Sequence, residues 1–229
     1  MDSPEARLVR AIRAGDVAAV SRLAAADPAL VTGPLPTGGG RTALHVATDW
    51  PGYLPYAPAI VRILIDAGAT VDARTAGPRG ETPLHWAASN DDADVAAVLI
   101  ERGADCEAPG GSIGTPLDNA IGYGCWQVAR LLVASGARVE RLWQAAALGL
   151  LTRTAELVEA DVTAEQVSEA FWHACRGGHR RTASLLLERG ADITFRPGYA
   201  SRQTLLEAVT APDTRHDLLP TWLREQVLS

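Results

Sequence analysis

The chain has 229 residues, 47% of them hydrophobic, which is enough to bury a continuous core within one extended domain. Its net charge is −6 and all 21 basic residues are arginine. This acidic balance argues against a nucleic-acid partner, because a phosphate backbone favours a basic surface. No apolar run reaches the roughly 18 residues of a membrane span, and the start of the chain lacks the basic-then-apolar order of a signal peptide.

Cysteine usage and overall composition suggest where the protein is found. Cys106, Cys125 and Cys175 are odd in number and follow no pairing pattern, so we expect reduced thiols and a cytoplasmic protein. The arginine- and alanine-rich composition is typical of a GC-rich genome, and we expect a bacterial source.

Near the start of the chain, residues 7–26 have apolar residues at helical spacing, among them Leu8, Ile12, Val20 and Leu23. A glycine at position 15 divides this stretch into two segments. We expect an atypical first repeat that caps an array of repeats.

A four-residue opening then recurs as Thr-Ala-Leu-His at Thr42, Thr-Pro-Leu-His at Thr82 and Thr-Pro-Leu-Asp at Thr115. The threonine can cap a helix, proline suits the first turn, and the leucine begins a buried face. Each opening is followed by an apolar helix, and the helices end at recurring glycines that can take a left-handed turn. These glycines are Gly68, Gly103, Gly136 and Gly190.

This order of Thr-Pro-Leu-His, two helices and a closing glycine, at a period of about 33 residues, resembles the ankyrin repeat. The resemblance covers essentially the whole chain and is most specific in residues 41–114. It implies an all-α fold, in which each unit is a turn plus two antiparallel helices and the units stack side by side. Ankyrin arrays generally act as interaction surfaces, so the resemblance implies a protein or peptide partner.

The predicted array is one domain, residues 1–229, with about six repeats, short hairpin loops and a C-terminal capping helix. The gap between Gly136 and Gly190 is too long for one repeat and short for two, so it contains a compact repeat. Thr163 and Gln166 have the spacing of a capping box and start the following helix. The predicted repeats span residues 5–40, 41–80, 81–114, 115–142, 143–168 and 169–202, followed by the cap at 203–229.

Two segments depart from the repeat pattern. Residues 51–58, PGYLPYAP, lie between the helices of the second repeat, and three prolines predict a stiff loop there. Residues 108–114, APGGSIG, form a glycine-rich hairpin that we expect to be mobile. This hairpin also matches G-x-S-x-G, but the motif needs a preceding buried strand, which the repeat does not supply.

The family's geometry implies which side chains line the concave face of the array. The resulting line of aromatic, amide and charged groups suits a peptide or a flat small molecule. In the alternative interpretation, several of the tryptophans only fill space between alanine-rich helices. The candidate binding residues are Asp49, Trp50, Trp86, Asn90, Asn119, Tyr123, Gln144, His173 and Arg176.

Other prominent residues have structural interpretations. The resemblance implies that His45 and His85 tie down hairpin turns, and that Asp118 replaces this histidine in the fourth repeat. Trp143 and Trp172 take the same position in the fifth and sixth repeats, where we favour packing, with each indole N–H bonded to a backbone acceptor. His173, Cys175 and His179 do not form a convincing metal site, since no fourth ligand appears and Cys175 replaces a core alanine.

If the protein is an enzyme, His173 and Asp49 are the candidate catalytic groups, since histidine changes charge near neutral pH. The two stand four repeats apart, roughly 10 Å per repeat, which argues against a shared reacting atom. We therefore expect a non-enzymatic binding module with no cofactor and no metal. The alternative is a small-molecule binder or a cyclase- or isomerase-like enzyme in the same groove. A third interpretation is a subunit that uses exposed Trp126 and Trp222 for self-contacts; the oligomeric state stays open.

Overall fold

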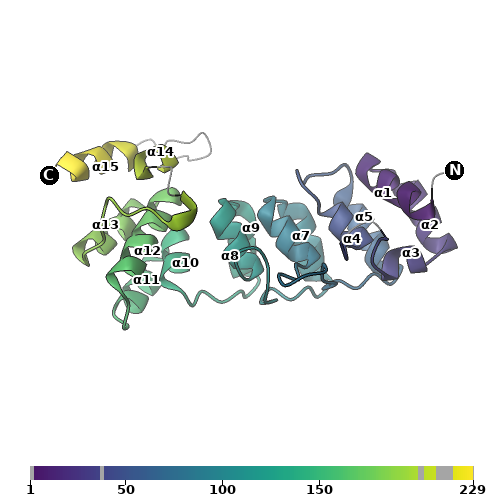
Figure 1. Cartoon of the computed structure of the whole chain (residues 1–229), viewed down its shortest axis with the longest axis horizontal. Helices are drawn as coiled ribbons and strands as arrows, with labels where there is room; N and C mark the ends of the chain where they lie inside the picture. The colour runs from purple at the N-terminus through teal and green to yellow at the C-terminus, as the bar shows by residue number, and fades with distance from the viewer. Residues whose placement is uncertain (1–2, 37–38, 201–203, 210–218, 229) are drawn as a thin grey trace. The chain divides into compact units, whose positions relative to one another are not determined.

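The computed structural model describes residues 3–36, 39–200, 204–209 and 219–228, and these residues form helices and no strand. The chain divides into two compact units, residues 1–138 and 139–229, and each is described by itself (Figure 1). The single domain expected from the sequence therefore stays a prediction. None of the described helices combines the length and apolar character that crossing a membrane requires.

In the described residues of the first unit, four helix pairs form two rows. Helices α1, α4, α6 and α8 pack in succession, and α2, α5, α7 and α9 form the row behind them. A short helix that the sequence pattern does not predict, α3, follows the first pair. The bounds are α1 Pro4–Ala14, α2 Val17–Ala26, α3 Ala29–Thr32, α4 Ala43–Ala47, α5 Ala57–Asp66, α6 Pro83–Ser89, α7 Ala93–Glu101, α8 Pro116–Tyr123 and α9 Trp126–Ala134.

A buried histidine fixes the start of α6 and the hairpin that follows it. His85 Nδ1 accepts a hydrogen bond from the Thr82 backbone N–H at 3.2 Å, and Thr82 Oγ1 accepts from the His85 N–H at 3.4 Å. The other ring nitrogen donates to the Gly114 carbonyl at 3.0 Å. This arrangement requires the neutral imidazole, and burial lowers the pKa of His85 accordingly.

The same device recurs in the neighbouring repeats. His45 accepts from the Thr42 N–H at 3.1 Å and bonds the Glu81 carbonyl at 3.0 Å. In the fourth repeat Asp118 accepts from the Thr115 N–H at 2.9 Å. The predicted structural roles of these residues are confirmed, since each one ties a helix start to its turn.

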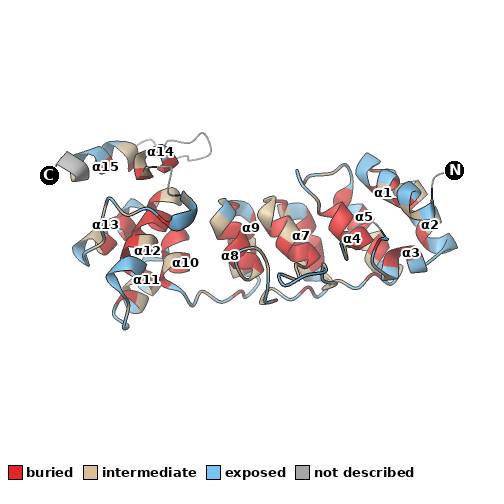
Figure 2. Cartoon of the chain, in the orientation of Figure 1, coloured by how far each residue is buried: buried red, intermediate tan, exposed pale blue. Residues whose placement is uncertain are grey.

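The second unit contains two further pairs and the C-terminal helices, and its core gathers around Phe171, Trp172, Cys175 and Leu186 (Figure 2). Burial of Cys175 in the place of a core alanine is confirmed, and it raises the pKa of the thiol. The bounds are α10 Leu142–Ala147, α11 Leu151–Val158, α12 Ala164–Arg176, α13 Arg180–Glu188, the 3-10 helix η1 Gly198–Ala200, α14 Leu205–Val209 and α15 Leu219–Leu228.

Helix starts in the second unit differ from the histidine pattern. Gln144 Oε1 accepts from the Glu140 and Arg141 N–H groups at 3.0 and 2.9 Å. The expectation that Trp143 takes the position of the turn histidine is therefore wrong by one residue, since Gln144 occupies it. The predicted capping box at α12 is confirmed by bonds of 2.8 and 3.2 Å between Thr163 and Gln166. Trp172, deep inside α12, is buried as predicted, and Trp143 packs partly buried against the same core.

The insertion and the glycine-rich hairpin are both held by specific contacts. The predicted end of the insertion at Pro58 is wrong, because α5 begins at Ala57 and proline is tolerated in a first turn. In the hairpin, the Gly111 N–H donates to the Arg79 carbonyl at 2.9 Å, and Ile113 N–H donates to Asn119 Oδ1 at 3.0 Å. These bonds argue against the expected mobility.

The C-terminal cap is described only in part. The expected end of its first segment, residues 211–213, lies outside the described residues, as does the start at Gln203. The expected closing helix is confirmed as α15, which packs on α14 and contributes Leu219 and Leu223 to the core.

The double anchoring by His85 predicts a measurable loss of stability on its removal. We expect His85→Ala to lower the free energy of unfolding by about 2 to 4 kcal/mol, since it leaves a cavity and two unpaired buried backbone groups. His85→Gln is the matched control, because Gln144 performs the capping half of this role in α10. It should lose less, and equal losses in urea unfolding would contradict the proposed double role.

Candidate functional site

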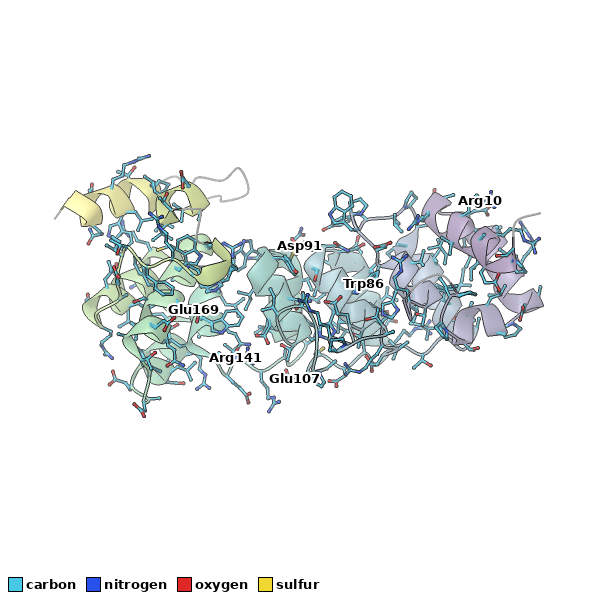
Figure 3. All side chains as sticks on the ribbon, viewed as in Figure 1. Arg10, Trp86, Asp91, Glu107, Arg141 and Glu169 are labelled. Carbon is cyan, nitrogen blue, oxygen red and sulfur yellow. The ribbon has the colours of Figure 1, made fainter. Side chains whose placement is uncertain are left out.

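The first unit carries a shallow, open depression of about 310 Å³ that contains several of the predicted binding residues. Its walls come from the ends of α4, α6 and α8 and from the loops that precede α6 and α8. Trp86, labelled in Figure 3, lies on α6 in this surface. The lining residues are Asp49, Trp50, Arg79, Glu81, Trp86, Ser89, Asn90, Ser112 and Tyr123.

Asp49 lies at the centre of a charged network at one end of the depression. Its Oδ2 atom is 3.3 Å from Arg13 and 3.3 Å from Arg41, and its Oδ1 atom accepts from the Trp50 N–H at 3.0 Å. Two guanidinium groups thus neutralise one carboxylate. Asp49 is therefore an anchor that positions the two arginines and the adjacent loop.

Trp86 is half-buried and held on three sides. Its indole N–H donates to Glu81 at 3.0 Å, the Arg41 guanidinium lies 5.7 Å from its ring, and His45 meets it edge-on at 5.1 Å. Because its orientation is fixed in this way, it offers a rigid aromatic edge and contributes to packing as well. These contacts support the packing interpretation of Trp86, and its role in binding stays a prediction.

Trp50 is held very differently, with 80% of the residue exposed. The loop that carries it is fixed at both sides: the Gly52 N–H donates to the Asp49 carbonyl at 2.9 Å, and the Tyr53 N–H donates to Asp92 at 2.7 Å. The Tyr53 hydroxyl also bonds the Asp91 carbonyl. A large apolar ring thus projects from an anchored loop.

Asn90, Asn119 and Tyr123 differ in their exposure. Asn90 is half-buried and donates to the Thr48 carbonyl at 2.9 Å. Tyr123 is 53% exposed, and its hydroxyl donates to Ser112 Oγ at 3.0 Å. Asn119 was expected on the exposed face and is fully buried, because its side chain bridges the Ile113 N–H and the Ser89 hydroxyl.

The remaining predicted residues belong to the second unit. The exposure expected for Gln144 is wrong, since its capping bonds turn it into the protein. Arg176 ends α12 and is half-buried. Only six of the nine candidates, those from Asp49 to Tyr123, belong to the first unit, and five of these line the depression.

His173 was expected to face the groove, and it is only 3% exposed. The ring lies 5.0 Å from that of Trp143, and its Nε2 atom shares a 3.0 Å hydrogen bond with the Tyr199 hydroxyl. Tyr199 lies in η1, which follows α13 and which no repeat motif marks. The His173 ring is covered because Trp143 and Tyr199 both lie against it.

Burial, with a smaller contribution from the Arg176 charge, lowers the pKa of His173 to about 3. His173 is therefore neutral at physiological pH, and the expectation that it changes charge near neutrality is wrong. Its Nδ1 atom has no hydrogen-bond partner among the described residues. The Trp172 indole N–H, expected to find a backbone acceptor, lies near the Tyr199 hydroxyl without a well-formed hydrogen bond.

The sequence interpretation missed three charged residues of this surface: Arg41, Arg79 and Glu81. Arg41 and Glu81 each immediately precede the threonine of a repeat opening, so both occupy the same place in successive repeats. This equivalent position in two repeats could have identified both residues from the sequence. In the part of the chain that the structure describes, no group of three or more His, Cys, Asp or Glu side chains is arranged to hold a metal ion.

The buried neutral His173 makes stability depend on pH. The unfolded chain takes up a proton on this residue near pH 6.5 and the folded chain only near pH 3, so stability is full above pH 6.5 and falls below it. Between pH 7 and pH 5 we expect a loss of about 2 kcal/mol from this group. Urea unfolding at pH 7 and pH 5 measures this loss. The free energy of unfolding of His173→Phe should fall by about 2 kcal/mol less between these pH values than that of the original chain. If the two proteins lose the same amount, a group other than His173 is responsible.

Comparison with known proteins agrees with the helix-pair architecture. Residues 56–141 match the family model described as ankyrin repeats (3 copies). Human ankyrin repeat and SOCS box protein 16 is 41% identical over 90 residues, and its mouse counterpart is 37% identical over 90 residues. Each alignment covers 38% of this chain and 19% of the relative, so the chain matches only a small part of these proteins.

A solved structure extends the likeness of fold. The human ASB11 ankyrin repeat domain matches 97% of this chain and 98% of its own length, with a TM-score of 0.56 and 21% identity. These relatives are animal proteins, and the comparison gives no support to the expected bacterial source. The chain therefore has an all-helical ankyrin-repeat fold, and its residues 56–141 match the ankyrin-repeat family model.

Proposed function

We propose that the protein is a non-enzymatic binding module whose first unit recognises an extended segment of a protein or peptide partner. The main observation behind this proposal is that Trp50 is 80% exposed and projects from an anchored loop beside an open depression. Ankyrin repeats generally bind protein partners, and the family match supports that class of function.

Trp50 has the properties of an interface anchor. Tryptophan is enriched among the residues that dominate binding energy, because it buries a large area with few rotatable bonds. The loop around it is held by Asp49, Asp91 and Asp92 through the bonds described above. Because the loop is already held in place, binding of a partner costs little conformational entropy for ordering it.

The floor beside Trp50 suits a peptide backbone or polar side chains. Ser112, Tyr123 and Asn90 offer hydroxyl and amide groups, and the exposed Arg79 adds a cation at the rim. Aromatic rings at Trp86 and Tyr123 alternate with these polar groups. Such a mixture of apolar area and fixed hydrogen-bonding groups favours specific recognition over general stickiness.

A small-molecule or enzymatic role in this depression is the weaker alternative. The volume of about 310 Å³ lies at the lower end of the range for ligand pockets, and the depression is open. Asp49 is neutralised by Arg13 and Arg41, and neither Tyr53 nor Tyr56 of the insertion lines the depression. These observations favour a binding surface over a closed catalytic site.

We also propose a cytoplasmic setting. Cys106, Cys125 and Cys175 are all free thiols, which is the usual state in a reducing compartment. The acidic net charge supports a protein partner over a nucleic acid.

Quantitative affinity capture from the native host's lysate tests the proposal. Trp50→Ala should reduce capture of specific partners at least tenfold, since it removes an anchor, and should leave the melting temperature within a few degrees because the ring is exposed. Leu151→Ala, which removes an exposed apolar side chain of the second unit, is the matched control and should capture normally. Equal capture by the original chain and Trp50→Ala would refute a role for this surface.

A further inference from the structure

The first helix pair carries a second, larger hollow. It measures about 1140 Å³ and lies between α1 and α2. Residues from α1 and α2, with Asp16 from the turn between them, supply its whole described lining. The α1 positions are Arg7, Arg10, Ala11 and Ala14, and the α2 positions are Ala19, Arg22, Leu23 and Ala26.

Both sets of positions follow the same spacing of i, i+3, i+4 and i+7. This spacing marks one continuous stripe along a helix, so each helix presents one stripe to the hollow. The residues that face the rest of the unit are different ones. Leu8 and Ile12 of α1, and Val20 and Ala24 of α2, are buried where α1 packs on α4 and α2 packs on α5.

The floor of the hollow consists of small apolar side chains. Ala14 and Ala26 are exposed, and Ala19 and Leu23 are half-buried. Two antiparallel helices with small residues between them form a groove into which the side-chain ridge of a third helix can pack.

The arginines around this floor indicate the charge of a helix that could pack there. In the first unit, ion pairs between arginine and a carboxylate join each repeat to the next. These pairs are Arg13 with Asp49, Arg62 with Glu101, Arg102 with Asp66 and Arg138 with Glu107, at 2.5 to 3.3 Å. Each of these four ion pairs joins an arginine of one repeat to a carboxylate of its neighbour.

Arg7 and Arg22 border the hollow on opposite helices, and neither has an ion-pair partner among the described residues. Arg10, labelled in Figure 3, adds a third guanidinium on α1. These cations stand out in a chain of net charge −6. They lie where a further packed helix would bring its carboxylates, by the rule that the other repeats follow.

We propose that the groove between α1 and α2 is a docking site for an acidic amphipathic helix of a partner protein. The helix would place alanine and leucine side chains on the floor at Ala14 and Ala19, and glutamate or aspartate beside Arg7 and Arg22. This surface is separate from the depression at Trp50, and the proposal does not depend on the function proposed there.

A labelled synthetic peptide tests the proposal on the full chain. The probe has about 15 residues, with alanine and leucine on one stripe and glutamate on both flanks, and a matched probe carries lysine in place of glutamate. Fluorescence anisotropy should show binding of the glutamate peptide only. Arg7→Gln with Arg22→Gln should raise its Kd roughly five- to tenfold, as expected for two exposed ion pairs.

Two further variants separate docking in the groove from general attraction to arginine. Arg130→Gln with Arg181→Gln removes the same charge at exposed positions elsewhere and should leave the Kd within about twofold. Ala14→Gln fills the groove without changing charge and should weaken binding about tenfold or more, with an unchanged circular dichroism spectrum.

The proposal fails if the two peptides bind alike, if neither binds, or if Ala14→Gln binds as well as the original chain. It also fails if the glutamate peptide is inert while phosphatidylserine vesicles bind through Arg7 and Arg22, since the site would then be a membrane contact.

Discussion

The array of the first unit depends on one interaction that is repeated with different residues. A side chain three positions into the inner helix accepts a hydrogen bond from the backbone before that helix, as His45, His85 and Asp118 do. The two histidines also bond the loop of the following repeat. These bonds fix each helix start together with the next turn, so the side chains just after that turn have a defined position.

Substituting this residue changes what the repeat presents. In α10 the role passes to Gln144, which folds inward and no longer faces a ligand. Burial of Asn119 has a similar origin, because its amide fixes the hairpin that carries Ser112 beside Tyr123. Asn119, which was expected to bind a partner, thus helps to build the surface on which Tyr123 is exposed.

The sequence predicted the repeats well because their signals are local. Thr82 and Pro83 act on backbone groups a few residues away, and the same opening recurs at Thr42 and Thr115. The exposure of single groove residues was not predictable in this way. His173 is covered by Tyr199, 26 positions later in η1, which no motif marks. Gln144 turns inward because α10 begins after Arg141, which places Gln144 at the third helical position, where α6 has His85. Arg41 and Glu81 were within reach of the sequence, since they occupy equivalent positions before each opening.

The position of Asp49 links charge to the spacing of the repeats. Its carboxylate is shared between Arg13 of the first repeat and Arg41 of the second, and Arg41 also lies over the ring of Trp86 in the third. Neighbouring repeats are therefore joined at the surface by groups that a tension along the array would separate. Stretching α1 away from α4 would withdraw one cation from Asp49 and make the depression more negative. The electrostatic potential of this surface thus depends on the distance between α1 and α4 as well as on the side chains that line it.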